Sequence, residues 1–121
     1  MSNLTRRTYF FDIDGTLFHH GHDLVGMMMG EPRLIEGTQE TLLKLRAEGH
    51  YIIITTARPE GLRSLTETHL HQVGVFYDQL VMGLTSGPRV LVNDTKPDGT
   101  ITAIAHSIKR DSGINKIPGL V

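Results

Sequence analysis

The feature that most constrains the fold is a short, wholly apolar run, Tyr51–Ile54, which lies between two stretches with helical periodicity. A strand without alternating polar residues is typical of a parallel sheet that is covered on both faces. One helix is expected from Thr38, as its cap, to about Glu48, and a second is opened by Pro59 and stopped by Gly74. Strands that alternate with helices in this way predict an α/β fold with a mainly parallel sheet.

Further apolar runs are expected to supply the other strands. They are Tyr9–Phe11, Leu80–Met82 and Val90–Val92, while Ile101–Ala105 is either a last strand or the start of a helix. The side chains expected to face the core from the two helices are Leu42, Leu43 and Leu45, then Leu62, Leu65, His69 or Leu70, and Val73. We interpret residues 1–121 as a single Rossmann-like domain with three layers.

Two segments have no sustained period. Residues 17–36 are interpreted as a flap-like loop, and residues 112–121 as a C-terminal strap along the surface. The flap holds a cluster that suggests zinc: His19, His20, His22 and Asp23. Because histidines on a flexible loop lack the fixed geometry of a dedicated zinc site, a substrate-facing or solvated flap is the preferred interpretation. Met27–Met29 is interpreted as loop packing or as part of a subunit interface.

Composition excludes several classes of protein. There is no cysteine, so disulfides and thiolate metal sites are ruled out. The formal net charge of −1 lacks the basic excess of a protein that coats nucleic acid. The first residues contain no apolar run long enough for a signal peptide or a membrane span. We therefore expect a soluble, cytoplasmic protein.

Polar residues follow three of the expected strands. Asp12 and Asp14 end the first, Thr55–Arg58 the second, and Asn93–Asp98 the fourth. Because ligands of parallel α/β sheets bind beyond the carboxyl ends of the strands, these residues are expected in one crevice. Carboxylates from two strand ends can hold Mg²⁺, and a hydroxyl and a cation can bind phosphate oxygens. The combination predicts a phosphoryl-transfer site.

Each piece alone has a plainer explanation. Asp-x-Asp-Gly is common in turns, and Asn93-Asp94 alone is usually a turn as well. A calcium loop would need Asp or Asn at its fifth position and Gly at its sixth, but Thr16 and Leu17 stand there. It is the joint placement at successive strand ends that favours a functional site.

With these motifs, the sequence resembles the haloacid dehalogenase superfamily of phosphohydrolases. Asp12–Leu17, preceded by an apolar strand, is similar to the first motif of that family. The resemblance implies that Asp12 is the nucleophile, which forms an aspartyl-phosphate. It also implies that Asp14 is the general acid/base and that it binds the metal through its backbone carbonyl. A carboxylate nucleophile splits one hydrolysis into two easier steps.

The second and fourth motifs give further expectations. Ile53–Arg58 resembles the second motif, in which Thr56, with Thr55 as competitor, binds the phosphoryl group. Asp94 resembles the acidic metal ligand of the fourth motif, so the metal set is Asp12, Asp14 and Asp94, with Asp98 as an outer carboxylate. Asn93 departs from the Asp or Gly that is usual there. Arg58 either contacts substrate or caps the neighbouring helix region.

The third motif is irregular, since Leu84-Thr85 replaces the expected Lys-Pro. Lys96 is the preferred substitute cation, and Arg89 is the alternative. A solvated turn is the plain explanation of Lys96.

The resemblance also implies a capless subgroup, because neither insertion point has room for a cap domain. We expect a Mg²⁺-dependent phosphomonoester hydrolase that acts on a phosphorylated sugar or a related small metabolite. A homo-oligomer is expected to cover the site, and no membrane partner is expected. The alternatives are a nucleic-acid-end or protein phosphatase of the same family, a non-catalytic binding module with this fold, and a signalling receiver domain. A receiver domain would have its phosphorylated Asp on the third strand, not the first.

Overall fold

The computed structural model describes residues 5–21 and 24–119. Three parallel strands form one sheet in the order β1-β2-β3, with β1 at Thr8–Phe11, β2 at Tyr51–Thr55 and β3 at Gln79–Val81. Phe11 pairs with Ile54, and Ile54 pairs with Leu80. The expected α/β fold with a parallel sheet is confirmed, and so are the first three strands.

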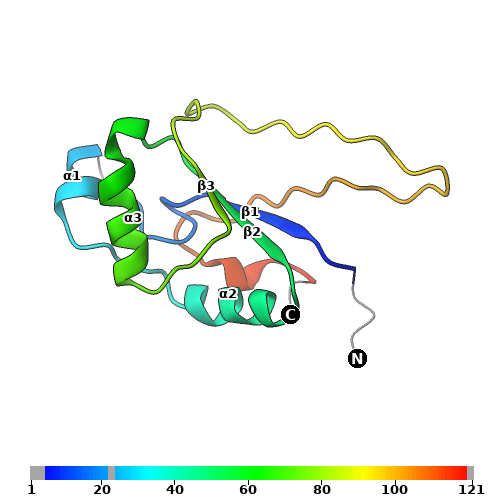
Figure 1. The fold of residues 1–121 in the computed structure, drawn as a ribbon, viewed down its shortest axis with the longest axis horizontal. Coiled ribbons are helices and arrows are strands. Elements are labelled where there is room, and N and C mark those ends of the chain that lie inside the picture. The colour runs from blue at the N-terminus through cyan, green and yellow to red at the C-terminus, as the bar shows by residue number, and fades with distance from the viewer. Residues whose placement is uncertain (1–4, 22–23, 120–121) are drawn as a thin grey trace.

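Two helices connect the strands (Figure 1). Helix α2 spans Thr38–Ala47, and α3 spans Arg63–Gln72 directly after a 3₁₀ turn at Glu60–Leu62. Gly37, rather than Thr38, is the N-cap residue of α2, because the buried Thr38 already lies in the first turn and its hydroxyl points to the Leu17 carbonyl oxygen at 3.5 Å. Pro59 precedes the second helical segment as expected.

The sheet is covered by helices on one face. Since successive strands are added in one direction, right-handed crossovers place α2 and α3 on the same side. The covered face and the two helices share one core, whose members include Phe11, Ile52, Ile54, Leu80, Leu42, Leu45 and Leu70. The opposite face is open, and Phe10, Tyr51 and Val81 are exposed on it. The described residues therefore form two layers, and the third layer of the expected architecture is not among them.

The prediction for one core residue, Leu43, is wrong. Leu43 is 54% exposed, while Leu42 and Leu45 are fully buried. Leu43 lies one position after Leu42, about 100° around the helix, and this rotation turns it away from the sheet. The error follows from three leucines within four positions, of which the sheet contacts only two.

The segments outside this frame differ most from expectation. The flap contains a short helix, α1 at Leu24–Met29, and no cap domain is inserted within the described ranges. Residues 112–121, expected to lie along the surface, contribute to the core. Ile114, in the 3₁₀ turn Ile114–Lys116, is fully buried. Among the described helices the longest have ten residues, and none is long and apolar enough to cross a membrane.

The expected fourth strand, Val90–Val92, is not formed. Residues 85–107, which we call the arm, leave the domain after β3, run outward, turn and return (Figure 1). The turn at the tip is closed by hydrogen bonds from the Lys96 and Gly99 amides to the Thr100 and Lys96 carbonyls, at 2.9 and 2.8 Å. Ile101–Ala105 lies on the returning half and is neither strand nor helix. An apolar run predicts a strand only where a partner strand is available, and the arm lies away from the sheet.

Candidate active site

The two aspartates lie in a tight loop that follows β1. The Ile13 carbonyl accepts hydrogen bonds from the Leu17 and Phe18 amides at 2.8 and 2.9 Å, and the Gly15 amide donates to the Phe18 carbonyl at 2.7 Å. Ile13 and Leu17 are fully buried and anchor the loop in the core. Gly15 has φ +90°, which favours glycine, and a Cβ there would meet the Arg110 side chain at 3.2 Å. The loop thus fixes Asp12 and Asp14 at the carboxyl end of the sheet.

Asp12 is open to solvent, yet protein atoms remove part of the hydration of its carboxylate. This desolvation raises the pKa of Asp12 above its usual value. The hydrogen bond from the Ile13 amide and the charge of Arg89 oppose the rise, because both favour the ionised form, and His20 acts in the same direction. Asp14 adds to the rise by repulsion. The raised pKa of an accessible carboxylate beside a second one is typical of a functional position.

Asp14 is held by Arg58. Its two carboxylate oxygens accept hydrogen bonds from Arg58 Nε and Nη2 at 2.9 and 2.8 Å, which is a bidentate ion pair. Arg58 is only 4% exposed, also donates to the Thr66 hydroxyl on α3 at 3.3 Å, and lies over the Phe18 ring. The sequence predicts that Arg58 either contacts substrate or caps the neighbouring helix region. The structure adds a further role, because its guanidinium positions Asp14.

Thr56 comes from the neighbouring strand end. Its side chain is buried, and its hydroxyl oxygen accepts a hydrogen bond from the Arg58 amide at 3.1 Å, which leaves the hydroxyl proton available to another acceptor. Thr55 is the last residue of β2 and is less buried. The parallel pairing of β1 with β2 places both threonines next to the loop that holds Asp12.

The structure does not bring Asp94 or Lys96 to this loop. Both are exposed near the tip of the arm, where the Asp94 carbonyl accepts from the Thr102 hydroxyl at 2.7 Å. The expectation that they share a crevice with Asp12 within one chain is wrong, because it required Val90–Val92 to join the sheet. In the described parts of the chain, no three His, Asp or Glu side chains are grouped to hold a metal ion.

Two oxygen donors at the loop nevertheless suit a hard cation. They are the Asp12 carboxylate and the Asp14 backbone carbonyl, which accepts no hydrogen bond from any described residue. The Asp14 carboxylate itself is occupied by Arg58. Two oxygens fit Mg²⁺, which keeps several waters and takes one or two carboxylates from the protein.

Arg89, the alternative to Lys96, lies at the root of the arm. It is close enough for its charge to lower the pKa of Asp12, and it is anchored locally by hydrogen bonds to the carbonyls of Thr85 and Gly87 at 3.1 and 2.9 Å. Lys96 has no such influence on Asp12.

Sequence reasoning missed Asp111. Its amide donates to the Gly15 carbonyl at 2.8 Å, and its carboxylate accepts from the His20 amide at 2.9 Å, so it ties the loop to the flap. Asp111 has a positive φ of 64°, a rare conformation for a residue other than glycine. No local sequence signal marks this role. His22 and Asp23 of the histidine cluster lie outside the described residues.

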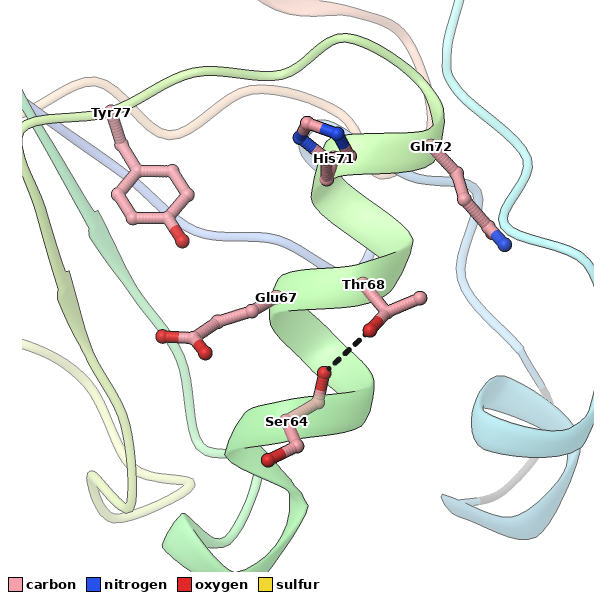
Figure 2. A pocket seen from close by; sticks show the side chains of 6 residues that line it. All are labelled: Ser64, Glu67, Thr68, His71, Gln72 and Tyr77. Carbon is pink, nitrogen blue, oxygen red and sulfur yellow. Dashed lines mark hydrogen bonds between the residues drawn. The ribbon is translucent and has the colours of Figure 1, made fainter.

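Of two surface depressions on the described part of the chain, one adjoins the aspartate loop. The first depression lies on the outer side of α3 and is also lined by Tyr77 (Figure 2). Within it, the Thr68 hydroxyl donates a hydrogen bond to the Ser64 carbonyl at 2.9 Å. None of its lining residues belongs to the aspartate loop. The second is polar and adjoins the loop through Asp111 and His19, and its other lining residues include Glu36, Glu40 and Lys116.

Known proteins resemble this chain in fold and in sequence. The chain is similar in structure to one chain of a solved structure titled "Structure of Pnkp1/Rnl/Hen1 complex", with a TM-score of 0.57 and 24% identity. The match covers 74% of this chain and 32% of that one, so this chain spans about a third of its length. No curated protein matches the chain. A family model described as haloacid dehalogenase-like hydrolase matches residues 9–75, which is more than half of the sequence and includes Asp12, Asp14, Thr56 and Arg58. The chain therefore belongs to the haloacid dehalogenase-like hydrolases.

Proposed function

We propose that the protein is a Mg²⁺-dependent phosphomonoester hydrolase that uses Asp12 as nucleophile. The observation that carries the proposal is the aspartate loop, in which an exposed carboxylate stands two residues from a second carboxylate that Arg58 holds in place. Membership of a hydrolase family supports it independently. The proposed compartment is the cytoplasm.

The reaction would proceed in two displacements. An Asp12 oxygen attacks phosphorus, the bond from phosphorus to the ester oxygen breaks, and Asp14 protonates the departing oxygen to give the alcohol. Asp14 then accepts a proton from water as the water oxygen attacks phosphorus, and the bond to Asp12 breaks to release inorganic phosphate. Arg58 uses two of the four lone-pair sites of the Asp14 carboxylate, so the others stay available for this proton.

Other side chains would bind the phosphoryl group. The Thr56 hydroxyl has a free proton to donate to a phosphate oxygen, and Arg89 would balance negative charge next to Asp12. Mg²⁺, held by the Asp12 carboxylate and the Asp14 carbonyl, would neutralise charge on the phosphoryl oxygens. The polar depression beside Asp111 would hold the rest of a small phosphorylated substrate, such as a sugar phosphate.

The test is release of inorganic phosphate by the purified protein with Mg²⁺. The panel contains sugar phosphates, nucleotides, a phosphopeptide and an oligonucleotide with a terminal phosphate. We expect turnover of a small phosphate ester, and we expect Asp12→Asn to reduce it by up to roughly 10⁶-fold, the order found when a nucleophile is removed. Glu67→Gln, which removes an exposed carboxylate on α3, is the control and should retain activity.

Three other results would change the conclusion. Turnover of the oligonucleotide or phosphopeptide alone would replace the small metabolite as substrate. Full activity of Asp12→Asn would rule out the nucleophile. No turnover of any ester would favour a binding module with this fold.

A further inference from the structure

A turn near the C-terminus lies against the aspartate loop. We call it the C-terminal turn, Lys109–Ser112, and a hydrogen bond from its last amide to its first carbonyl closes it at 3.1 Å. The Asp111 amide donates to the Gly15 carbonyl at 2.8 Å. On either side of the turn, Ile108 packs against the core and Ile114 is fully buried. The turn is therefore fixed beside Gly15 by a hydrogen bond and by two apolar anchors.

Arg110 belongs to this turn, and its side chain lies across Gly15. A Cβ at Gly15 would meet Arg110 Cγ at 3.2 Å, Nε at 3.6 Å and Cδ at 3.8 Å, so the glycine leaves room for the arginine stem. Within the described ranges, the Arg110 guanidinium forms no hydrogen bond or ion pair. By contrast, the guanidinium groups of Arg46, Arg58 and Arg63 are each paired with a carboxylate. Arg110 thus presents its N–H donors beside the aspartate loop without a partner from these parts of the protein.

The position of Arg110 determines which part of a substrate it can reach. On one side it borders Gly15, and on the other the next two residues of the turn, Asp111 and Ser112, line the polar depression. The proposed function gives the transferred phosphoryl group a metal ion, a hydroxyl and Arg89, and it assigns the rest of the substrate to this depression. Arg110 therefore lies where the leaving group extends from the phosphoryl site into the depression.

The chemistry of the side chains distinguishes two parts of such a leaving group. A guanidinium binds a carboxylate or a phosphate through two parallel hydrogen bonds, whereas a neutral hydroxyl offers neither the charge nor the second acceptor. The depression is lined by Glu36, Glu40 and Asn115, whose oxygens accept hydrogen bonds from hydroxyl groups. Hydroxyls therefore suit the depression, and an anion suits Arg110.

We propose that Arg110 is a specificity-determining residue that binds an anionic group on the leaving part of the substrate. The substrate class is then a phosphate ester whose alcohol also carries a carboxylate or a second phosphate, such as a phosphorylated hydroxy acid or a sugar bisphosphate. This inference rests on the proposed function, but binding by Arg110 can be measured without turnover.

The first experiment compares esters with and without this anion. Release of phosphate with Mg²⁺ is measured for 3-phosphoglycerate against glycerol 3-phosphate, and for fructose 1,6-bisphosphate against fructose 6-phosphate. At least one anionic ester should exceed its counterpart in kcat/KM, and the pair concerned distinguishes a carboxylate from a phosphate. Arg110→Gln should lower that kcat/KM roughly ten- to hundredfold, mainly through KM, because it removes a hydrogen bond between charged groups. Arg110→Lys should restore part of the loss.

Two other exposed cations provide matched controls. Lys109 lies in the same turn, while Arg6 lies over a glycine as Arg110 does, since a Cβ at Gly49 would meet Arg6 Nε at 3.2 Å. Gly49 precedes β2 and is at the amino end of the sheet, away from the site. Lys109→Gln and Arg6→Gln should keep the preference for the anionic ester. A natural protein without this preference, or an Arg110→Gln variant that keeps it, would overturn the proposal.

A second experiment measures binding without turnover. Calorimetry in the Asp12→Asn background with Mg²⁺ gives the Kd of 3-phosphoglycerate and of fructose 1,6-bisphosphate, and adding Arg110→Gln should raise one of them roughly tenfold or more. If the natural protein hydrolyses no ester but this rise is present, the proposed function alone fails. If it hydrolyses esters and neither kcat/KM nor Kd depends on Arg110, this inference alone fails. Absence of both turnover and Arg110-dependent binding would refute both.

Discussion

At the scale of single residues, Asp12 is the group whose environment is most informative. Its pKa is raised, first by desolvation, and Arg89 lowers it. In metal-free protein, the carboxyl of Asp12 should therefore titrate above the ordinary value of 3.8 when it is followed by NMR. Arg89→Ala should move this midpoint further up, and Lys96→Ala should leave it unchanged. An upward shift in the Lys96 variant instead would identify Lys96 as the cation beside the nucleophile.

The same shift has a consequence for stability. A carboxyl whose pKa is raised by folding stabilises the folded protein below its unfolded-state pKa, and that stabilisation is lost as the pH rises through the folded-state value. Asp12→Asn should thus be more stable than the natural protein at pH 7 without divalent cations. The difference should vanish at a pH well below 3.8, where both side chains are neutral. Urea unfolding at the two pH values measures it.

Arg58 and Asp14 offer a second prediction at this scale. Arg58→Met should lower the free energy of unfolding by roughly 3 kcal/mol or more, because it leaves a largely buried carboxylate without its partner. Arg63→Met, which breaks exposed pairs with Glu60 and Glu67 and a hydrogen bond to the Leu80 carbonyl at 3.1 Å, is the control and should cost less than Arg58→Met. Urea denaturation compares the two, and an equal loss in both would mean that the Arg58 pair is not special.

At the scale of elements, the core side of α2 can be tested by two leucines of one helix. Leu45→Ala should cost about 2–5 kcal/mol, because the side chain is fully buried against the sheet. Leu43→Ala should cost far less, since its side chain is largely exposed. Chemical denaturation distinguishes them, and a large loss for Leu43→Ala would show that a partner covers this position.

The elements also show how far a sequence can be interpreted. The first two strands and the helix between them were predictable because local periodicity, the Gly49 stop and the aspartate loop all agree. Gly49, with φ +86°, ends α2 as a glycine at this position should. Val90–Val92 has equally good strand character, but its pairing depends on the chain length that joins it to β3, and this cannot be inferred from apolarity alone.

The site was predictable to the same extent. A motif was enough to place Asp12, Asp14 and Thr56, because each comes directly after the end of a strand in the sequence. The bond from Arg58 to Asp14 spans 44 positions, and the Asp111 contact with His20 spans 91, and neither distance leaves a local pattern. Lys96 was preferred over Arg89 because of a strand that does not form in the described chain.

At the scale of the whole molecule, the homo-oligomer expected to cover the site would make activity depend on concentration. If a neighbouring copy covers each site, specific activity should fall when the protein is diluted below the dissociation constant of the oligomer, because a single copy leaves its site uncovered. Activity measured over several decades of protein concentration tests this, with mass measured in parallel. Activity that stays constant while the mass halves would mean that one chain is sufficient.

The long exposed arm also has a consequence for proteolysis. Arg89 and Lys96 are exposed on it and lie outside any helix or strand, and exposed segments of this kind are preferred sites of proteolytic cleavage. Trypsin would therefore cut the chain in the arm before it cuts the sheet and its helices.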